Sequence, residues 1–185
     1  LLAQSFTSLT DTPQLLRELA LRDGRVRPLF AGRNLGIPGG RQAGLEEAEG
    51  EYVLFLDNDT EIERSDFMEV MVQALESHPN AGSTGAFATV YTSDRNDSFI
   101  QCVHVPGLIA PVAWCSGYCL MVRRSALDDI GGLDSGFFQP YGSEDVYLGY
   151  KLREHGWMTV STADLVAVTH HIAHRDYHYD YDWQK

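Results

Sequence analysis

The sequence predicts an α/β protein with a mostly parallel, doubly wound sheet flanked by helices. Segments with helical and strand patterns alternate along the first part of the chain, as they do in successive β–α units. The segment Tyr52 to Leu56 is continuously apolar, which is typical of a central parallel strand buried on both faces. Apolar residues make up 44% and charged residues 22% of the 185 residues, which is enough apolar material for a packed core.

The first predicted helix begins at Thr12, because threonine caps helices well and Pro13 suits a first helical turn. Leucines then recur at helical spacing until Gly24 ends the helix. A short strand is expected from Val26 to Phe30. The opening segment, Leu1 to Phe6, resembles the end of a helix.

Residues 32–40 are rich in glycine and include a proline, so we expect a loop there. A helix is predicted from Arg41 to Ala48, before the strand Tyr52 to Leu56. The next helix is predicted from Ser65 to Ser77, because its apolar residues share one face and Pro79 ends it.

The second half of the chain continues the alternation of strands and helices. Residues 92–114 are irregular. The remaining strands are expected at Gly85 to Tyr91, Tyr118 to Val122, Trp157 to Thr162 and Leu165 to Thr169. The remaining helices are expected from Ser125 to Ile130 and from Glu144 to His155, the second capped by Ser143 and stopped by Gly156.

The charge of the chain argues against nucleic acid as a partner. The formal net charge is −12 and the pI is about 4.8, and the sequence holds no clustered basic patch. An acidic protein that handles an anionic substrate would need a metal ion or a few well-placed arginines. No apolar run approaches the length of a membrane span, and no signal peptide is visible, so we expect a cytoplasmic location.

Three cysteines are too few and too irregularly spaced for a disulfide framework or a common zinc site. We expect Cys102, Cys115 and Cys119 to be small buried apolar residues in a reducing compartment.

Asp57 and Asp59 follow the apolar strand directly, and their spacing places both carboxylates on one side of an extended chain. Open α/β sheets bind ligands at this carboxyl end. Two close carboxylates repel each other unless a cation neutralises them, and Mg²⁺ or Mn²⁺ bound to a diphosphate would do so. An ordinary solvated turn explains the same residues. An EF-hand loop is excluded, because its sixth and twelfth positions would hold Ile62 and Met68.

Glu144 and Asp145 lie at the start of a predicted helix. The helix dipole favours acids there, which is a sufficient structural explanation. A carboxylate at this place can also act as a general base toward an attacking hydroxyl. His170 directly follows the predicted strand Leu165 to Thr169 and is a credible metal ligand, although a lone histidine is more often an ordinary surface residue.

Together these segments resemble the family-2 glycosyltransferases of GT-A fold. The matching segments, in the order of the family, are Asn34 to Leu45, Gly50 to Asp59 with its Asp-x-Asp motif, Ser116 to Arg124 with Gly131 to Asp134, Glu144 to Val146 with His155 to Trp157, and the strand ending at His170. Each motif is weak alone, but the set in this order is specific and covers residues 12–171.

The resemblance implies roles for individual residues. Asp59 and Asp57 would bind the metal and the nucleotide sugar, and Asn34 and Arg41 would contact the nucleotide sugar. His170 would be the third metal ligand, and Asp145 the catalytic base, with Glu144 beside it in the acceptor site.

The activity implied is an inverting transfer from a nucleotide-diphosphate sugar to an acceptor hydroxyl, assisted by Mn²⁺ or Mg²⁺. The acceptor would be a saccharide or a lipid-linked saccharide, as in polysaccharide biosynthesis. Such an enzyme would work in the cytoplasm, and a peripheral position on the inner face of the membrane is compatible with it.

The sequence also departs from the family pattern. Gln42 replaces the usual asparagine, and Tyr147 stands where an acid is common. We expect residues 1–185 to form a single GT-A domain without the usual first two strands. A non-catalytic relative that serves as a sugar-binding or scaffold module therefore remains an alternative. A sugar-phosphate nucleotidyltransferase is disfavoured, because the chain lacks an N-terminal glycine-rich, basic nucleotide loop.

Overall fold

The computed structural model describes residues 12–86, 111–133 and 143–162 with their side chains, and the backbone of residues 2–4, 88–91, 100–102, 110 and 168–170. The described helices are α1 (Thr12–Arg22), α2 (Gly36–Glu47), α3 (Phe67–Glu76), α4 (Arg124–Ile130) and α5 (Glu144–Glu154). None of them combines the length and apolar character that a helix needs to cross a lipid bilayer.

The largest sheet has five strands in the order β3-β10-β5-β11-β8. These strands are β3 (Tyr52–Leu56), β10 (Cys119–Arg123), β5 (Ala81–Gly85), β11 (Met158–Ser161) and β8 (Ala110–Val112). β10 pairs antiparallel with both β3 and β5, whereas β11 pairs parallel with β5. Strands β3, β5 and β11 therefore share one direction in a mixed sheet, and the predicted α/β class is confirmed.

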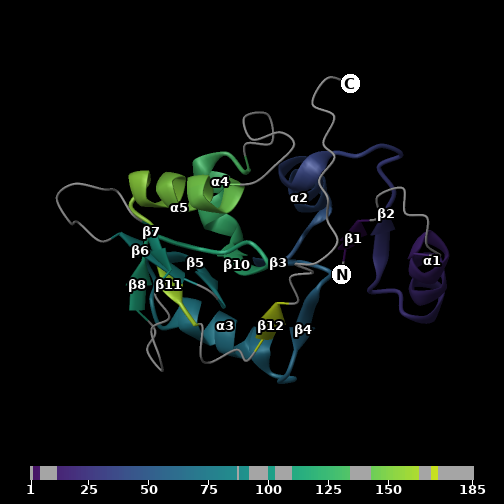
Figure 1. Ribbon diagram of the computed structural model, residues 1–185, viewed down its shortest axis with the longest axis horizontal. Coiled ribbons are helices and arrows are strands. Elements are labelled where there is room, and N and C mark those ends of the chain that lie inside the picture. Colours follow the sequence, from purple (N-terminus) through teal and green to yellow (C-terminus); the bar gives the residue numbers. More distant parts are fainter. Residues whose placement is uncertain are drawn as a thin grey trace.

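The sheet separates two apolar layers, and Figure 1 shows helices on both of its faces. Helices α4 and α5 cover one face and α3 covers the other. Because side chains alternate along a strand, β10 contributes to both layers: Leu120 and Val122 pack with α4 and α5, whereas Cys119 and Met121 pack with α3. This alternation makes β10 the strand that joins the two layers.

β3 differs from its prediction as a central strand. It lies at one end of the five-stranded sheet in the described structure, and its hydrogen-bonded partner there, β10, is antiparallel. Its burial alternates: Val53 and Phe55 are buried, whereas Leu56 is 39% exposed.

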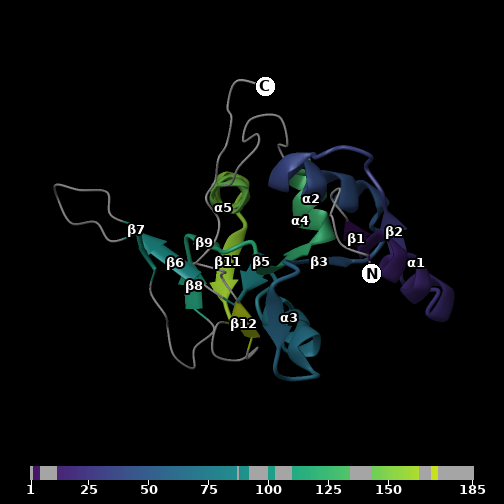
Figure 2. The ribbon, with the colours of Figure 1, turned by 45° about the vertical axis from the view of Figure 1, so that its right-hand side comes forward.

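Smaller sheets surround the large one. They are β1 (Leu2–Gln4) with β2 (Arg27–Leu29), β4 (Thr60–Ile62) with β12 (Val168–His170), and β6 (Ala88–Tyr91) between β7 (Ile100–Cys102) and β9 (Trp114–Cys115). Figure 2 shows β1, β2 and α1 together on the β3 side of the molecule. The prediction that Leu1 to Phe6 ends a helix is wrong, because Leu2–Gln4 pairs as a strand, parallel to β2.

The predicted loop at residues 32–40 is also partly wrong, because α2 begins at Gly36. Gly36 has a positive φ of 68° and its N–H donates to the side chain of Asn34 at 2.8 Å, so a turn leads directly into the helix. Pro38 lies in the first turn of α2, where a missing N–H costs no helical hydrogen bond. Arg41, in the middle of α2, reaches Asp57, the residue that follows β3.

Candidate active site

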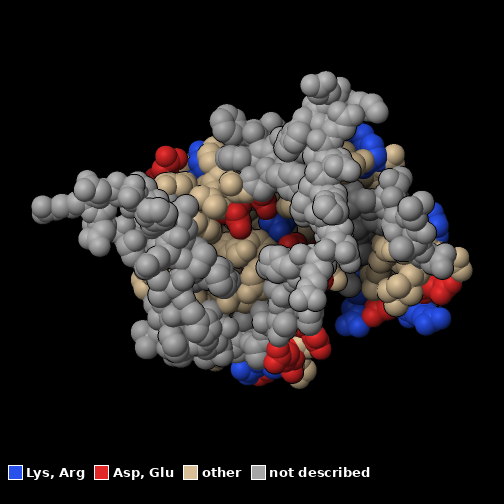
Figure 3. All heavy atoms as spheres, in the orientation of Figure 1, with Lys and Arg blue, Asp and Glu red and all other residues tan. Residues whose placement is uncertain are grey.

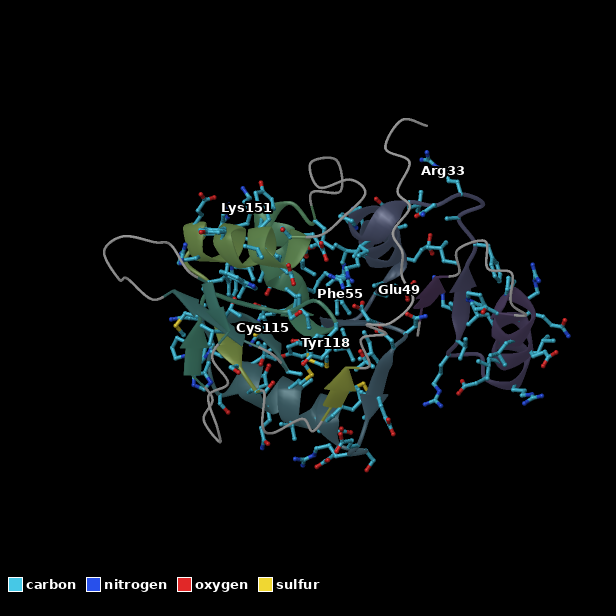
Figure 4. All side chains as sticks on the ribbon, viewed as in Figure 1. Arg33, Glu49, Phe55, Cys115, Tyr118 and Lys151 are labelled. Carbon is cyan, nitrogen blue, oxygen red and sulfur yellow. The ribbon has the colours of Figure 1, made fainter. Side chains whose placement is uncertain are left out.

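Arg41, in the middle of α2, holds two carboxylates from distant parts of the chain. Its Nη2 donates to Oδ1 of Asp57 at 2.9 Å, and its Nη1 donates to Oε1 of Glu144. The Arg41 side chain is 12% exposed and that of Glu144 is 8% exposed, whereas Asp57 is 40% exposed. The guanidinium also lies 6.0 Å from the centre of the Phe55 ring, which Figure 4 shows near the middle of the molecule. The pair with Glu144 is therefore buried, and the pair with Asp57 reaches solvent.

Figure 3 shows acidic and basic side chains side by side near the middle of one face of the molecule. A buried charge is stable only when it is paired and hydrogen-bonded. The ion pair with Arg41 meets this requirement for one oxygen of Glu144, whereas Asp57 is partly exposed to solvent.

Gly117 connects Arg41 to the predicted base. A Cβ atom at Gly117 would lie 2.0 Å from Nη1 of Arg41, so the guanidinium rests directly on the glycine backbone. The N–H of Gly117 donates to Oδ2 of Asp145 at 3.0 Å. The other oxygen, Oδ1, accepts from the N–H of Val146 at 2.8 Å. Two backbone donors thus orient the Asp145 carboxylate at the start of α5.

Asp57 and Asp59 lie in a tight turn rather than on an extended chain. The N–H of Asp57 donates to the carbonyl of Tyr118 at 2.9 Å, and the N–H of Thr60 donates to the carbonyl of Asp57 at 3.1 Å. The prediction that both carboxylates share one side of an extended strand is therefore wrong. Asp57 is half-buried beside Arg41, whereas Asp59 is exposed between β3 and β4.

The strand register brings His170 close to this turn. β12 pairs antiparallel with β4, and His170 is opposite Thr60, the residue after Asp59. Opposite Cα atoms in such a ladder are about 4.5–5.5 Å apart. The His170 side chain is outside the described part of the structure. Among the described side chains, no three His, Cys, Asp or Glu residues gather as a metal site.

Asn34 and Gln42 each make hydrogen bonds that stabilise the local structure. Asn34, predicted to bind the nucleotide sugar, is exposed and accepts the N–H of Gly36. Gln42, which departs from the family pattern, accepts the N–H of Leu133 at 3.2 Å and donates to Glu46 at 3.0 Å. Gln42 therefore ties α2 to the segment after α4.

The environment of the site shifts several pKa values. Burial raises the pKa of Glu144, and the nearby Arg41 guanidinium opposes this shift without cancelling it. Burial also raises the pKa of the Cys115 thiol, and it raises that of Cys119 to about 11. Both thiols are free and buried, as predicted. The side chain of Cys102 is outside the described residues.

Residues 7–131 match the sequence model of glycosyl transferase family 2. The chain belongs to this family. The match includes α1 to α4 and the Asp57–Asp59 turn, whereas Glu144, Asp145 and His170 follow it.

A curated relative supports the assignment over a shorter segment. The chain is 47% identical over 64 residues to an N-acetylglucosaminyl-diphospho-decaprenol L-rhamnosyltransferase of Mycobacterium tuberculosis. That segment is 35% of this chain and 20% of the relative, so the chain spans about a fifth of the relative's length in this match.

Solved structures share the fold at low sequence identity. A mannosyltransferase from Pyrobaculum calidifontis, in complex with GDP-Man and Mn²⁺, superposes with a TM-score of 0.64 at 18% identity over 88% of this chain and 45% of its own. GalNAc-T7, with UDP, GalNAc and Mn²⁺, gives a TM-score of 0.68 at 16% identity over 86% of this chain and 35% of its own. The predicted GT-A fold is thereby confirmed.

Proposed function

We propose that this chain carries the donor and catalytic residues of an inverting glycosyltransferase that moves a sugar from a nucleotide-diphosphate donor to an acceptor hydroxyl. The observation that carries the proposal is the meeting of three separate segments at Arg41. Asp57 from the β3 turn, Glu144 from α5 and Gly117 before β10 all contact this side chain. Family-2 membership makes sugar transfer the activity to test.

Asp145 is the general base in this proposal. The N–H groups of Gly117 and Val146 fix its carboxylate, so the carboxylate can accept the proton of an acceptor hydroxyl without reorienting. The deprotonated oxygen attacks the anomeric carbon while the bond to the diphosphate breaks. A single displacement of this kind inverts the anomeric configuration. Glu144 stands beside the base, paired with Arg41.

Arg41, Asp57 and Asn34 lie on the donor side in this proposal. The exposed carboxylate of Asp59, the half-buried one of Asp57 and the strand register of His170 fit a cation with oxygen and imidazole ligands. Asp57, Asp59 and His170 would hold Mg²⁺ or Mn²⁺. A divalent cation bound there would stabilise negative charge on the leaving diphosphate.

The name of the mycobacterial relative specifies L-rhamnosyl transfer and N-acetylglucosaminyl-diphospho-decaprenol. We therefore extend the proposal to a saccharide or lipid-linked saccharide as acceptor. The enzyme would act in the cytoplasm, peripherally at the membrane that holds such an acceptor.

Titration with nucleoside diphosphates tests the donor side. UDP, GDP and dTDP are each added with and without Mn²⁺, and binding is followed by calorimetry. We expect one nucleotide to bind in a Mn²⁺-dependent way, and we expect Asp59→Ala to abolish that dependence. Glu61→Ala is the matched control, because Glu61 is an exposed acid two residues further along the same segment.

Two results would count against the proposal. If no nucleotide binds at millimolar concentration, the chain is better described as a non-catalytic scaffold with a GT-A fold. If Asp59→Ala binds nucleotide with unchanged Mn²⁺ dependence, the metal assignment is wrong although the donor assignment survives.

A further inference from the structure

The Glu144 carboxylate is buried and faces the Arg41 guanidinium. Its side chain is 8% exposed and its Oε1 is paired with Arg41. Its Oε2 is buried and has no hydrogen-bond partner among the residues that the structure describes. A group that takes a proton from an incoming hydroxyl must lie within hydrogen-bond reach of it. Oε1 of Glu144 is occupied by Arg41 and Oε2 is enclosed, whereas the Asp145 residue beside it is partly exposed.

The Arg41 side chain is confined from several sides. Glu144 and Asp57 hold its two terminal nitrogens, and the Phe55 ring lies 6.0 Å from the guanidinium carbon. Gly117 closes the remaining side, because the position of its missing Cβ is only 2.6 Å from the guanidinium carbon and from Nη2. The guanidinium therefore cannot move without breaking an ion pair or displacing the Gly117 backbone.

Gly117 also donates a backbone hydrogen bond to Asp145, the proposed general base. Its N–H donates to Asp145 at 3.0 Å, so a shift of Arg41 against Gly117 would move this donor as well. Asp57, which pairs with the other terminal nitrogen of Arg41, is one of the residues proposed to bind the nucleotide sugar. Arg41 thus contacts residues on both sides of the proposed reaction centre.

We propose that Glu144 is a positioning residue that acts through Arg41, and that Arg41 seated on Gly117 couples the donor-side carboxylate Asp57 to the base Asp145. The proposal rests on the proposed transferase function. It assigns the proton transfer to Asp145 alone and gives Glu144 no contact with the acceptor. A change at Glu144 should then weaken nucleotide binding at a distance, through Arg41 and Asp57.

The first test separates positioning from proton transfer. Glu144→Gln keeps an oxygen that can accept from Arg41, whereas Glu144→Leu removes it. We expect Glu144→Leu to lower kcat by about 10²-fold, as small displacements of reacting groups do, and to weaken nucleoside diphosphate binding in Mn²⁺. We expect Glu144→Gln to recover most of both losses. The pH dependence of kcat/KM should keep its shape in Glu144→Gln, because Asp145 still takes the proton.

A double-mutant cycle tests the path through Arg41. Glu144→Leu and Arg41→Lys should be strongly non-additive in kcat, because each disturbs the same ion pair. Additive effects would show that Glu144 acts independently of Arg41 and would overturn the proposal. Loss of a limb of the pH profile in Glu144→Gln would overturn it too, because Glu144 would then be a proton-transfer group.

Glycine substitutions give a matched test with no change of charge. Gly117→Ala adds a methyl group at 2.0 Å from Arg41, whereas Gly44→Ala adds one to the same helix as Arg41 with no atom within 4 Å. We expect Gly117→Ala to lower both kcat and nucleotide affinity, and Gly44→Ala to leave both unchanged. Equal effects of the two substitutions, measured on protein shown to be folded by its thermal unfolding, would overturn the proposal.

The outcomes distinguish this inference from the function on which it rests. If wild-type protein neither binds nucleotide nor transfers sugar, the proposed function fails. If wild-type protein does both but Glu144→Leu keeps wild-type nucleotide affinity and kcat, only the coupling fails.

Discussion

The two faces of the five-stranded sheet are packed with different chemistry. On the α3 face, Met71 and Leu75 are fully buried against apolar strand residues. The α4 and α5 face has an apolar layer of its own, but beside it lie the buried charges of Arg41 and Glu144. Apolar burial stabilises a fold, whereas buried charges cost free energy to desolvate and are weak evidence for stability. Substitutions on the α3 face should therefore change mainly the free energy of unfolding, and substitutions at the charged residues should change mainly the rate of sugar transfer.

The largest effect is expected on the charged face. Asp145→Asn should lower the rate of sugar transfer by about 10²–10⁴-fold, because the amide cannot accept the proton. The affinity for nucleoside diphosphate should stay within about twofold of the wild-type value. The Asp145 carboxylate is hydrogen-bonded to backbone N–H groups rather than to the residues proposed to bind the nucleotide sugar. Steady-state kinetics and calorimetry on the same preparation check both statements. Wild-type turnover in this variant would refute the assignment of the base.

The opposite pattern is expected on the α3 face. Met71 is 0% exposed, so Met71→Ala should reduce the free energy of unfolding by about 2–5 kcal/mol through lost burial and a cavity. The folded fraction should keep its kcat. Urea unfolding and kinetics below the transition test this, and a large fall in kcat of the folded protein would erase the distinction between the two faces.

Two glutamates should give opposite pH dependences of stability. The pKa of Glu144 is raised, chiefly by burial, so the folded state holds this proton more tightly than the unfolded state. The unfolding free energy should then fall as pH rises from the ordinary glutamate value to the raised one. Glu144→Gln should remove this fall.

The pKa of Glu76, at the end of α3, is lowered, chiefly by a hydrogen bond from Tyr52. Its contribution should be present above the ordinary glutamate value and lost as pH falls toward the lowered one. Glu76→Gln should remove that loss. Unfolding curves measured at several acidic pH values give the direction of each stability change. If both glutamates changed stability in the same direction, the environment assigned to one of them would be wrong.

The smallest effect is expected outside both faces. Leu21, near the end of α1, is 87% exposed. Leu21→Gln should change the free energy of unfolding by less than about 0.5 kcal/mol, and it should leave transfer unchanged. Denaturant unfolding of this variant sets the baseline for the others, and a larger loss would indicate that α1 packs more tightly than its exposure suggests.

Local patterns predicted most helices and strands. The apolar run Tyr52–Leu56 coincides with β3, and the spacing of apolar residues found α3 within two residues of each end. The start of α2 was missed because Gly39 and Gly40 suggest a loop by composition. In the structure, Pro38 and Gly40 are buried within the helix, so close packing accounts for small residues there.

The order of the strands in the sheet could not be predicted from local sequence patterns. A run of apolar residues is compatible with either direction of its neighbour, so the insertion of antiparallel β10 between β3 and β5 left no local signal. The expectation of a central β3 failed for this reason.

The candidate site was predicted in part. Arg41, Asp57, Glu144 and Asp145 were found by motif, and the structure brings them together. Gly117 lies within the family motif Ser116 to Arg124, but no local pattern marks it as a site residue. Its role depends on a missing side chain beside a residue 76 positions away, which is not visible in any local pattern.

Ser143 gives the start of α5 a distinctive character. Its φ is 83°, a left-handed conformation that costs an L-residue roughly 1–2 kcal/mol, and its side chain makes no capping hydrogen bond to the helix. Such a conformation persists where neighbouring contacts enforce it. The contacts of Glu144 and Asp145 with Arg41 and Gly117 begin at the very next residue. The unfavourable backbone conformation of Ser143 is therefore adjacent to the two acids whose contacts fix the start of α5, and we expect loss of those contacts to loosen the helix first at this residue.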